Sequence, residues 1–488
     1  MGTNCIVEME GYRLSQEILN KKVSCVEVMK EYLDHIEKVN PSVNAIVSMP
    51  DTDGLIEQAK EKDRLINGGG VSGWMHGFPS AIKDLLETKG IRTTFGSLAL
   101  KDFIPQNDNE LVKRIKNAGA IIIGKTNTPE FGFGSQTYNE VFGVTGNPFN
   151  PEKTCGGSSG GAACSIALLM QPVADGSDYM GSLRNPAGWC NVYGFRPSVG
   201  VVPNTGFDLF SNTMGICGPM ARNVPDLALL LGTLSGMTSF APLSRDDKAN
   251  IKSLTPGNVF DKLKTDINGA KVAWLGDWDG HLAMENGVLE TTEKTLSGFP
   301  SFGVSVEKIK PFYDPAEFWE KIWLPIRRYS ACSVKRYIDG GHRDKLKPES
   351  IWEYDESTKT SAQDVYDAFV RRSSFYMAMM KVFDEYDYIA VPSAQVFPFD
   401  KTIRWPKEID GREMKTYHNW MEVATHWTMG ANAVISVPAG FGGKNNLPIG
   451  IQIAAKPGCD FELLQFAMAY EEANDFALKH RPALLGAI

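Results

Sequence analysis

The chain has 488 residues, of which 43% are hydrophobic and 22% charged, and its formal net charge at pH 7 is −8. A chain of this length can bury a large core and a deep, water-poor site, and its mild acidity argues against a protein that coats nucleic acid. No stretch approaches the roughly 18 apolar residues of a membrane span. Residues 1–10 lack the basic start and apolar core of a signal peptide. We therefore expect a cytoplasmic protein with no nucleic-acid or membrane partner.

The eight cysteines are scattered along the chain and include no CxxC pair. In a long chain without a signal peptide, this pattern indicates free thiols in a reducing compartment rather than a disulfide framework. We expect most of them to be small buried hydrophobic residues. They are Cys5, Cys25, Cys155, Cys164, Cys190, Cys217, Cys332 and Cys459.

The first 66 residues are predicted to be mainly helical. Ser24 and Glu27 have the spacing of a capping box, and apolar residues then recur at helical spacing up to residue 36. The Asn40-Pro41 pair is predicted to end this helix, since proline disfavours a helical conformation in the residue before it. A short strand is expected over residues 44–48.

Short apolar runs alternate with helical patterns across residues 67–232. A helix is predicted over 112–118, with Gly119 as its C-terminal cap and a buried strand over 120–123. Residues 162–170 are almost wholly apolar and are predicted to form a buried helix that starts from a glycine-rich loop. Such alternation favours a mixed α/β sheet covered by helices.

The second half of the chain divides into two parts. Residues 241–360 carry more charged and aromatic residues and are predicted to be a variable, mostly helical segment that shapes a substrate pocket. Apolar strands are predicted again at 388–392, 434–438 and 449–453, within a region from 385 to 488 that returns to the sheet. These strands need partners from the first half, so we expect one interwoven domain spanning residues 1–488.

Two motif matches in the sequence are misleading. Gly157, Ser159 and Gly161 fit the G-x-S-x-G nucleophile elbow, but no late histidine lies in a segment typical of the partner that this elbow requires. Residues 119–126 fit the G-x-x-x-x-G-K-T phosphate loop, yet the intervening residues have the character of a strand and Gly119 ends a helix. We expect neither chemistry here.

Three polar residues near glycines form the strongest candidate site. Lys83 lies in an apolar, strand-like run, Ser158 lies in a glycine-rich loop, and Ser182 follows Gly181. Taken singly, these features fit a surface lysine, a Gly/Ser linker and a surface turn. Together, two hydroxyls and an amine supply the nucleophile and base of an acyl-transfer site, provided that burial lowers the pKa of the lysine. No histidine or metal-ligand set lies in these segments, so the sequence predicts a serine hydrolase whose base is a lysine.

Seven motifs, spread over most of the chain, resemble those of the amidase signature family and follow the same order. They lie at residues 77–84, 124–131, 142–148, 156–161, 194–197, 218–222 and 437–440. The resemblance implies an α/β fold in which helices cover both faces of a mixed sheet. It also implies an amidase that needs no metal or other cofactor.

The resemblance further implies a role for each candidate residue. Ser182 corresponds to the nucleophile, Lys83 to the base, and Ser158 to a serine that bridges them. The peptide bond before Ser158 is expected to be cis, which would aim its hydroxyl between the lysine and the nucleophile. Backbone N–H groups are expected to form an oxyanion hole, and three polar side chains to support the site. The expected oxyanion-hole donors are the N–H groups of Tyr179, Met180, Gly181 and Ser182, and the expected supporting side chains are those of Ser159, Asp178 and Arg184.

The chain departs from the family pattern in two places. The oxyanion loop usually has small residues, whereas this chain has Tyr179 and Met180. Their backbone donors are unchanged, but their side chains can narrow the pocket, so the substrates of simpler amidases do not carry over. The other departure is the segment 241–360, which contains no motif of the family.

We expect an enzyme that cleaves small, largely apolar amides through an acyl-enzyme intermediate and works as a monomer or homodimer. The tryptophans of the middle segment favour aryl amides or oligoamides, and carbamates are a third option. Two alternatives remain open. One is the glutaminase subunit of a tRNA-dependent amidotransferase, which shares these motifs, and the other is a non-catalytic binding protein on the same scaffold.

Overall fold

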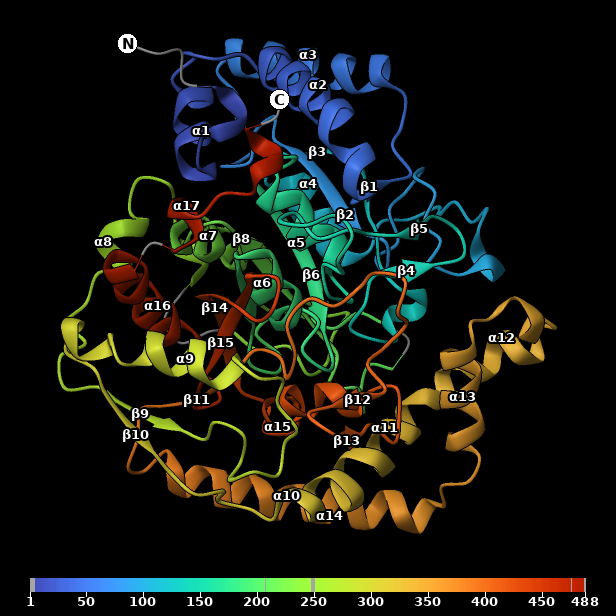
Figure 1. Cartoon of the computed structure of the whole chain (residues 1–488). Helices are drawn as coiled ribbons and strands as arrows, with labels where there is room; N and C mark the ends of the chain where they lie inside the picture. The colour runs from blue at the N-terminus through green and yellow to red at the C-terminus, as the bar shows by residue number, and fades with distance from the viewer. Residues whose placement is uncertain (1–4, 207, 247–250, 475, 487–488) are drawn as a thin grey trace.

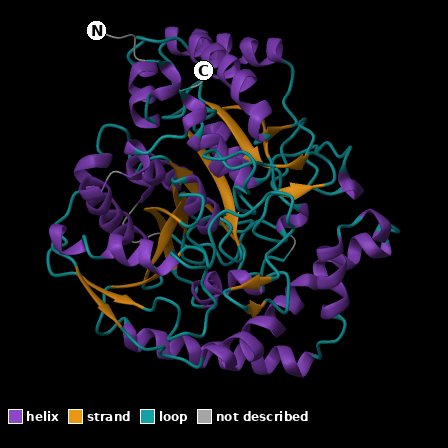
Figure 2. Ribbon diagram, in the orientation of Figure 1, coloured by secondary structure: helices purple, strands orange, loops and turns teal. Residues whose placement is uncertain are grey.

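The structure is a computed structural model that describes residues 5–206, 208–246, 251–474 and 476–486. Helices cover both faces of an eight-stranded mixed sheet (Figures 1 and 2), which confirms the predicted α/β class. The strand order is β10-β9-β11-β15-β14-β7-β8-β6. In chain order these strands are β6 Val173–Asp178, β7 Tyr193–Arg196, β8 Ile216–Ala221, β9 Lys271–Trp274, β10 Ser305–Lys308, β11 Tyr388–Pro392, β14 Ala433–Gly442 and β15 Leu447–Ala455.

The centre of this sheet comes from the last quarter of the chain. Strands β14 and β15 pair antiparallel with each other, and they join β7 on one side to β11 on the other. The strands predicted at 388–392, 434–438 and 449–453 are therefore confirmed, and the last two are longer than predicted. All of β11 and β15 is buried, which explains why the sequences of these strands are almost wholly apolar.

A smaller sheet carries the first part of the candidate site. Its order is β1-β3-β2, with β2 and β3 parallel and β1 antiparallel to β3. Strand β2, at one edge of this small sheet, lies against β6 of the large sheet (Figure 1). The strands are β1 Ile46–Val47, β2 Pro79–Lys83 and β3 Ile121–Thr126. Two further pairs are short: β4 Tyr138–Asn139 with β5 Gly143–Val144, and β12 Glu408–Ile409 with β13 Arg412–Glu413.

Among the described residues, three α-helices precede β2 in the chain and lie together at one end of the molecule, at the top of Figure 1. The predicted capping box is present, because Ser24 Oγ accepts the N–H of Glu27 and the Glu27 carboxylate accepts the N–H of Ser24. The helices are α1 Gly11–Leu19, α2 Cys25–Val43 and α3 Thr52–Asn67.

The prediction that Asn40-Pro41 ends the second helix is wrong. Pro41 lies inside α2, which continues to Val43 and ends where Asn44 adopts a left-handed conformation at φ 56°. Proline cannot donate a backbone hydrogen bond, but it falls in the last turn, where little helix remains to be disrupted. The Asn40 side chain then accepts the N–H groups of Ala45 and Ile46 just beyond the helix.

Helices of the core pack against the two sheets. The predicted helix at 112–118 is α4, and Gly119 follows it with φ 112°, as expected for its C-terminal cap. The predicted helix at 162–170 is α5, which begins at Gly160 and ends at Ala167, because Leu169 adopts a left-handed φ of 60°. The core helices are α4 Glu110–Asn117, α5 Gly160–Ala167, α6 Arg184–Cys190, α7 Val224–Leu234, α9 Val288–Leu296, α15 Thr425–Met429, α16 Asp460–Asn474 and α17 Phe476–Lys479.

The segment 241–360 contains helices, but it also supplies β9 and β10 to the edge of the large sheet, which the sequence did not predict. Three of the four residues of β10 are exposed, so this edge strand lacks an apolar sequence signal. Besides α9, the helices from residue 251 to residue 382 include α8 Val259–Leu263, α10 Pro315–Glu317, a π-helical stretch Phe318–Trp323, α11 Leu324–Ala331, α12 Lys335–Asp339, α13 Pro348–Ser357 and α14 Ala362–Val382.

We call α11, α12 and α13 the cap; these three helices lie at the lower right of Figure 1.

None of the eight cysteines, all of which the structure describes, is in a disulfide, as predicted. Four of them are buried, so the expectation of buried thiols holds for only half of the set. Among the described residues, no helix combines the length and apolarity needed to cross a membrane.

Candidate active site

Lys83 is the last residue of β2, and its side chain is buried. Its Nζ lies 2.8 Å from Ser158 Oγ, 2.8 Å from Ser159 Oγ and 2.9 Å from Ser177 Oγ. Within the described part of the chain, no carboxylate is in ion-pair contact with this amine. Burial lowers the pKa of Lys83 from 10.5 to about 7, although nearby carboxylate groups oppose that shift. A neutral amine, able to accept a proton, is therefore available near pH 7.

Ser158 lies in the glycine-rich loop that precedes α5. The peptide bond between Gly157 and Ser158 is cis, as the resemblance implies. The loop packs closely: Gly156 has φ 79°, and a Cβ atom there would lie 2.5 Å from the Oδ1 atom of Asn185. A glycine is therefore required at that position. The Ser158 hydroxyl accepts a hydrogen bond from Lys83 and also faces the main cavity.

Ser182 lies in the loop between β6 and α6, and Asp178 holds this loop in place. Each Asp178 carboxylate oxygen accepts one backbone N–H, from Gly181 and Leu183, both at 3.0 Å. Arg184 donates to both oxygens, at 2.7 and 2.9 Å, and all these groups are buried. Burial opposes ionisation of Asp178, but the charge of Arg184, with a second arginine nearby, holds its pKa below the usual value.

The oxyanion loop differs from the sequence expectation at Gly181. Its N–H group donates to Asp178 and is therefore not a free donor as the loop stands. The amides of Met180 and Ser182 have no partner among the described residues. Gly181 has φ 85°, so its contribution in this structure is the left-handed turn that a residue with a side chain rarely adopts.

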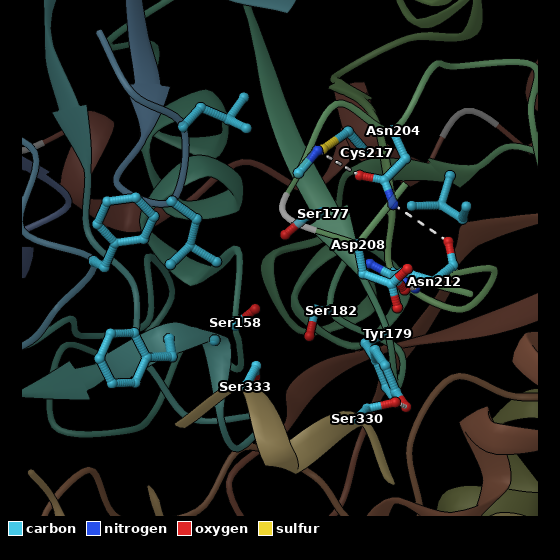
Figure 3. Close-up of a pocket in the computed structure, with 18 of the residues that line it drawn as sticks. Ser158, Ser177, Tyr179, Ser182, Asn204, Asp208, Asn212, Cys217, Ser330 and Ser333 are labelled. Carbon is cyan, nitrogen blue, oxygen red and sulfur yellow. Dashed lines mark hydrogen bonds between the residues drawn. The ribbon is translucent and has the colours of Figure 1, made fainter. Parts of the chain in front are cut away.

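The two serine hydroxyls face the same space. In Figure 3, Ser158 and Ser182 lie side by side in the pocket, with Ser177 nearby. Among the residues that the structure describes, no hydrogen bond joins the two hydroxyls, so the chain of contacts from Lys83 stops at Ser158. Catalytic hydrogen bonds often shorten only when substrate is bound.

The cavity in front of these serines has a volume of about 790 Å³. Apolar and aromatic side chains form much of its wall, and another part is formed by the polar residues Asn204, Thr205, Asp208, Ser211 and Asn212. No histidine is among the described residues that line it. Its apolar lining includes Leu85, Leu86, Phe95, Leu111, Phe131, Phe133, Tyr179, Val202, Ile216, Val334 and Tyr337.

The cap supplies one wall of the cavity. The guanidinium of Arg327 lies 4.8 Å from the ring centre of Phe133 and 4.9 Å from that of Tyr179. Arg327 Nε donates to Glu353 at 2.7 Å, and the Tyr179 hydroxyl donates to Ser330 at 2.7 Å. The bulky Tyr179 side chain therefore connects the oxyanion loop to the cap.

Buried polar contacts fix the cap to the rest of the molecule. The Glu130 carboxylate accepts the Lys347 N–H at 2.9 Å and the Ser350 hydroxyl at 2.6 Å, while Lys347 Nζ donates to the carbonyl of Phe133. The ring of Phe131 also stacks on that of Tyr337, with centres 4.5 Å apart. The cavity wall is thus held from several sides.

Several known proteins are similar to this chain over nearly its whole length. The amidase family model matches residues 27–464. The chain is 31% identical to a glutamyl-tRNA(Gln) amidotransferase subunit of Caldanaerobacter subterraneus subsp. tengcongensis, covering 96% of this chain and 98% of that protein. It is also 30% identical to an acylamidase of Rhodococcus erythropolis, covering 97% of each chain. The chain belongs to the amidase signature family. A bacterial aryl acylamidase of that family superposes with a TM-score of 0.86 at 27% identity, over 96% of this chain and 97% of the other.

Two groups of the candidate site were missed by the sequence analysis. Ser177 belongs to no motif, yet its hydroxyl contacts Lys83, and the Asp175 carboxylate accepts the Lys83 N–H. Both lie on β6, and residues two apart in a strand face the same side. That spacing, upstream of Asp178, is the signal that could have identified them.

The two misleading motifs are explained by the fold. Ser159 precedes α5, and its hydroxyl contacts Lys83 rather than a histidine. Lys125 lies at 0% exposure in β3 and donates to the Leu86 carbonyl and the Thr88 hydroxyl. The expectation that these segments form neither a nucleophile elbow nor a phosphate loop agrees with both placements. Within the described ranges, no group of three or more potential ligand residues is arranged to hold a metal ion.

Proposed function

We propose that this amidase cleaves small, largely apolar amides with Ser182 as nucleophile, Ser158 as the bridging serine and Lys83 as the base. The observation that carries this proposal is the buried Lys83 amine, whose contacts are hydroxyl and carbonyl groups and whose pKa is about 7. A lysine in that state can accept a proton at neutral pH.

The reaction follows as one proton relay. Ser182 Oγ attacks the amide carbon while its proton passes to Ser158, and the Ser158 proton passes to neutral Lys83. When the carbon–nitrogen bond breaks, the relay runs in reverse and the proton goes to the leaving nitrogen, which departs as an amine. Water then attacks the acyl-enzyme with the same base, and release of the acid restores Ser182.

The carbonyl oxygen needs hydrogen-bond donors as it becomes negative. The Met180 and Ser182 amides are the candidates that have no partner among the described residues, and the Tyr179 amide completes the expected group. The Gly181 amide can take part only if it leaves Asp178. Ser159, Asp178 and Arg184 support the site through the contacts described above.

The aromatic wall of the cavity supports aryl amides, oligoamides or carbamates as substrates. The acylamidase among the relatives points in the same direction. A comparison of 4-nitroacetanilide, a linear oligoamide and an aryl carbamate with acetamide tests this proposal. A clear preference for acetamide would contradict it.

A second candidate function rests on the amidotransferase relative, which is 31% identical over nearly the whole of both chains. In that case the chain would release ammonia from glutamine within a complex. Purification of the chain alone, followed by assays of glutamine and of 4-nitroacetanilide, separates the two functions. Activity on the anilide by a lone monomer or homodimer supports the amidase, whereas glutaminase activity that depends on partner subunits supports the alternative.

Labelling with a fluorophosphonate, followed by peptide mass spectrometry, tests the assignment of the nucleophile. We expect an adduct on Ser182 that is lost when Lys83 is replaced by alanine. An adduct on Ser159 would overturn the assignment. Absence of both labelling and hydrolysis would favour a binding protein on the same scaffold.

A further inference from the structure

On the edge of β2 that faces away from β3, side-chain oxygens accept the backbone N–H groups that the carbonyl groups of a paired strand would otherwise accept. Gln171 Oε1 accepts the N–H of Ala81 at 2.8 Å, and the Asp175 carboxylate accepts the N–H of Lys83 at 3.1 and 3.3 Å. Both bonds are buried, and they join the small sheet to the segment that forms β6 of the large sheet. The backbone of Lys83 is therefore fixed at the seam between the two sheets.

Asp175 differs in its partners from the other carboxylate whose charge acts on Lys83. Asp178 is paired with Arg184 and lies 3.4 Å from Arg196. Among the described residues, no guanidinium is in ion-pair contact with Asp175. The Asp175 carboxylate instead accepts hydrogen bonds from the backbone N–H of Lys83. Its negative charge is thus left to act on the amines around it.

The remaining groups facing this position come from β3 and β8. Burial raises the pKa of Asp175 above its usual value, although the Lys83 N–H opposes that rise. Lys125 on β3 is a second buried amine, and its charge, like that of the Lys83 amine, also opposes the rise. Cys217 on β8 stays a neutral thiol, because burial raises its pKa to about 12. Of the two carboxylates that act on Lys83, Asp175 is therefore the one without an arginine partner among the described residues.

We propose that Asp175 is a positioning residue that fixes Lys83 at the seam and, through its charge, sets the pH above which Lys83 can act as a base. This inference rests on the proposed function of Lys83. Removal of the charge would favour the neutral amine further, so Lys83 would become active at lower pH and would also be a weaker base.

Gln171 provides a matched control. It makes the same kind of backbone contact two residues earlier on β2, but it carries no charge. The Asp175→Asn variant keeps an acceptor and loses the charge, whereas Gln171→Leu loses an acceptor and leaves the charge unchanged. Asp175→Glu keeps the charge and tests whether the folded site tolerates a change at this position.

The experiment measures how fast a fluorophosphonate labels Ser182 between pH 5 and 9, in the full-length protein and in each variant. Thermal melting in the same buffers checks folding. We expect the wild-type rate to rise with a midpoint near pH 7, and the Asp175→Asn midpoint to lie about 1 pH unit lower, the low end of the effect of a neighbouring charge. Gln171→Leu and Asp175→Glu should keep the wild-type midpoint, whatever their rates.

An unchanged midpoint in Asp175→Asn would overturn the inference and leave Asp175 with a structural role only. An equal shift of the midpoint in Gln171→Leu would also overturn the inference, because the loss of a backbone contact, rather than of a charge, would then explain the shift. If Asp175→Asn does not fold, a wild-type midpoint in Asp175→Glu supports the inference and a displaced one contradicts it. A different result would show that the proposed function itself is wrong: Ser182 in the Lys83→Met variant would be labelled as fast as in the wild type, with the same pH profile.

Discussion

Two buried basic side chains lie at the same cavity, and their partners differ: Arg327 lines it, whereas Lys83 lies behind Ser158 and Ser177, which line it. Lys83 contacts hydroxyl groups, and its pKa falls to about 7 because burial disfavours its charge. Burial also disfavours the charge of Arg327, but Glu353 and Tyr417 bond to its guanidinium and raise its pKa above the usual value. Burial alone therefore does not decide whether a cation can lose its proton. The hydroxyl contacts leave Lys83 able to transfer protons, whereas the carboxylate makes Arg327 a permanent charge in the cap.

The largest expected effect comes from giving the site a cation that cannot lose its proton. In Lys83→Arg the charge stays, so Ser158 has no acceptor for its proton. We expect the rate of Ser182 labelling at pH 8 to fall by at least about 100-fold, the lower range for loss of a general base. Lys83→Met should show a similar loss without an added charge. A labelling rate within a few-fold of wild type in both folded variants would contradict the role of Lys83.

Removal of the carboxylate that pairs with Arg327 should lower the stability of the protein. Glu353→Gln removes the charge beside buried Arg327, and we expect the free energy of unfolding to fall by about 3 kcal/mol, because an uncompensated buried charge remains. Urea denaturation measures this loss. The double variant Arg327→Met, Glu353→Leu should lose less than the single one, since it leaves no unpaired charge. A larger loss in the double variant would show that the ion pair itself stabilises the cap.

The comparison can be sharpened by measuring stability against pH. The pKa of Lys83 is about 7 in the folded protein and 10.5 without burial, so the unfolded chain binds more protons between these values. The free energy of unfolding should therefore rise with pH from about 7 to 10.5, by at most about 1.4 kcal/mol per pH unit from this residue. Lys83→Met should remove that part of the slope. Equal slopes in the two proteins would show that Lys83 is not buried as an amine of low pKa.

The smallest effect is expected where the two regions meet. Tyr179→Phe removes the hydrogen bond from the oxyanion loop to Ser330 and should cost about 1 kcal/mol of stability. Ser330→Ala should cost a similar amount, and the double variant little more, because both remove the same contact. Full additivity in thermal denaturation would mean that the two side chains stabilise the protein independently.

Motifs with local geometry made much of the candidate site predictable. The glycine-rich loop, the cis bond before Ser158 and the convergence of Ser158 with Lys83 all appear where the resemblance placed them. The burial of Lys83 could not be read from its strand alone, because a lysine at a strand end is usually at the surface. Its burial depends on β6 and β8, which lie more than 80 residues later in the chain.

Features set by tertiary contacts were missed. The engagement of the Gly181 amide follows from the position of the Asp178 carboxylate, which a count of backbone donors does not reveal. Asp175 and Ser177 acquire their contacts only when β6 lies beside β2. In the same way, β10 is recognisable as a strand only through its pairing with β9, since its own residues are mostly polar.

The strand order has a consequence for how the chain folds. The group β6-β8-β7 and the group β10-β9-β11 are joined through β14 and β15, which begin at Ala433. During synthesis, β7 and β11 therefore each lack one neighbouring strand until almost nine-tenths of the chain has left the ribosome. Arg184, which braces the loop of Ser182, also waits for the Ala424 carbonyl and the Gln452 side chain. The site is thus completed late, and shorter fragments would expose sheet edges that favour aggregation.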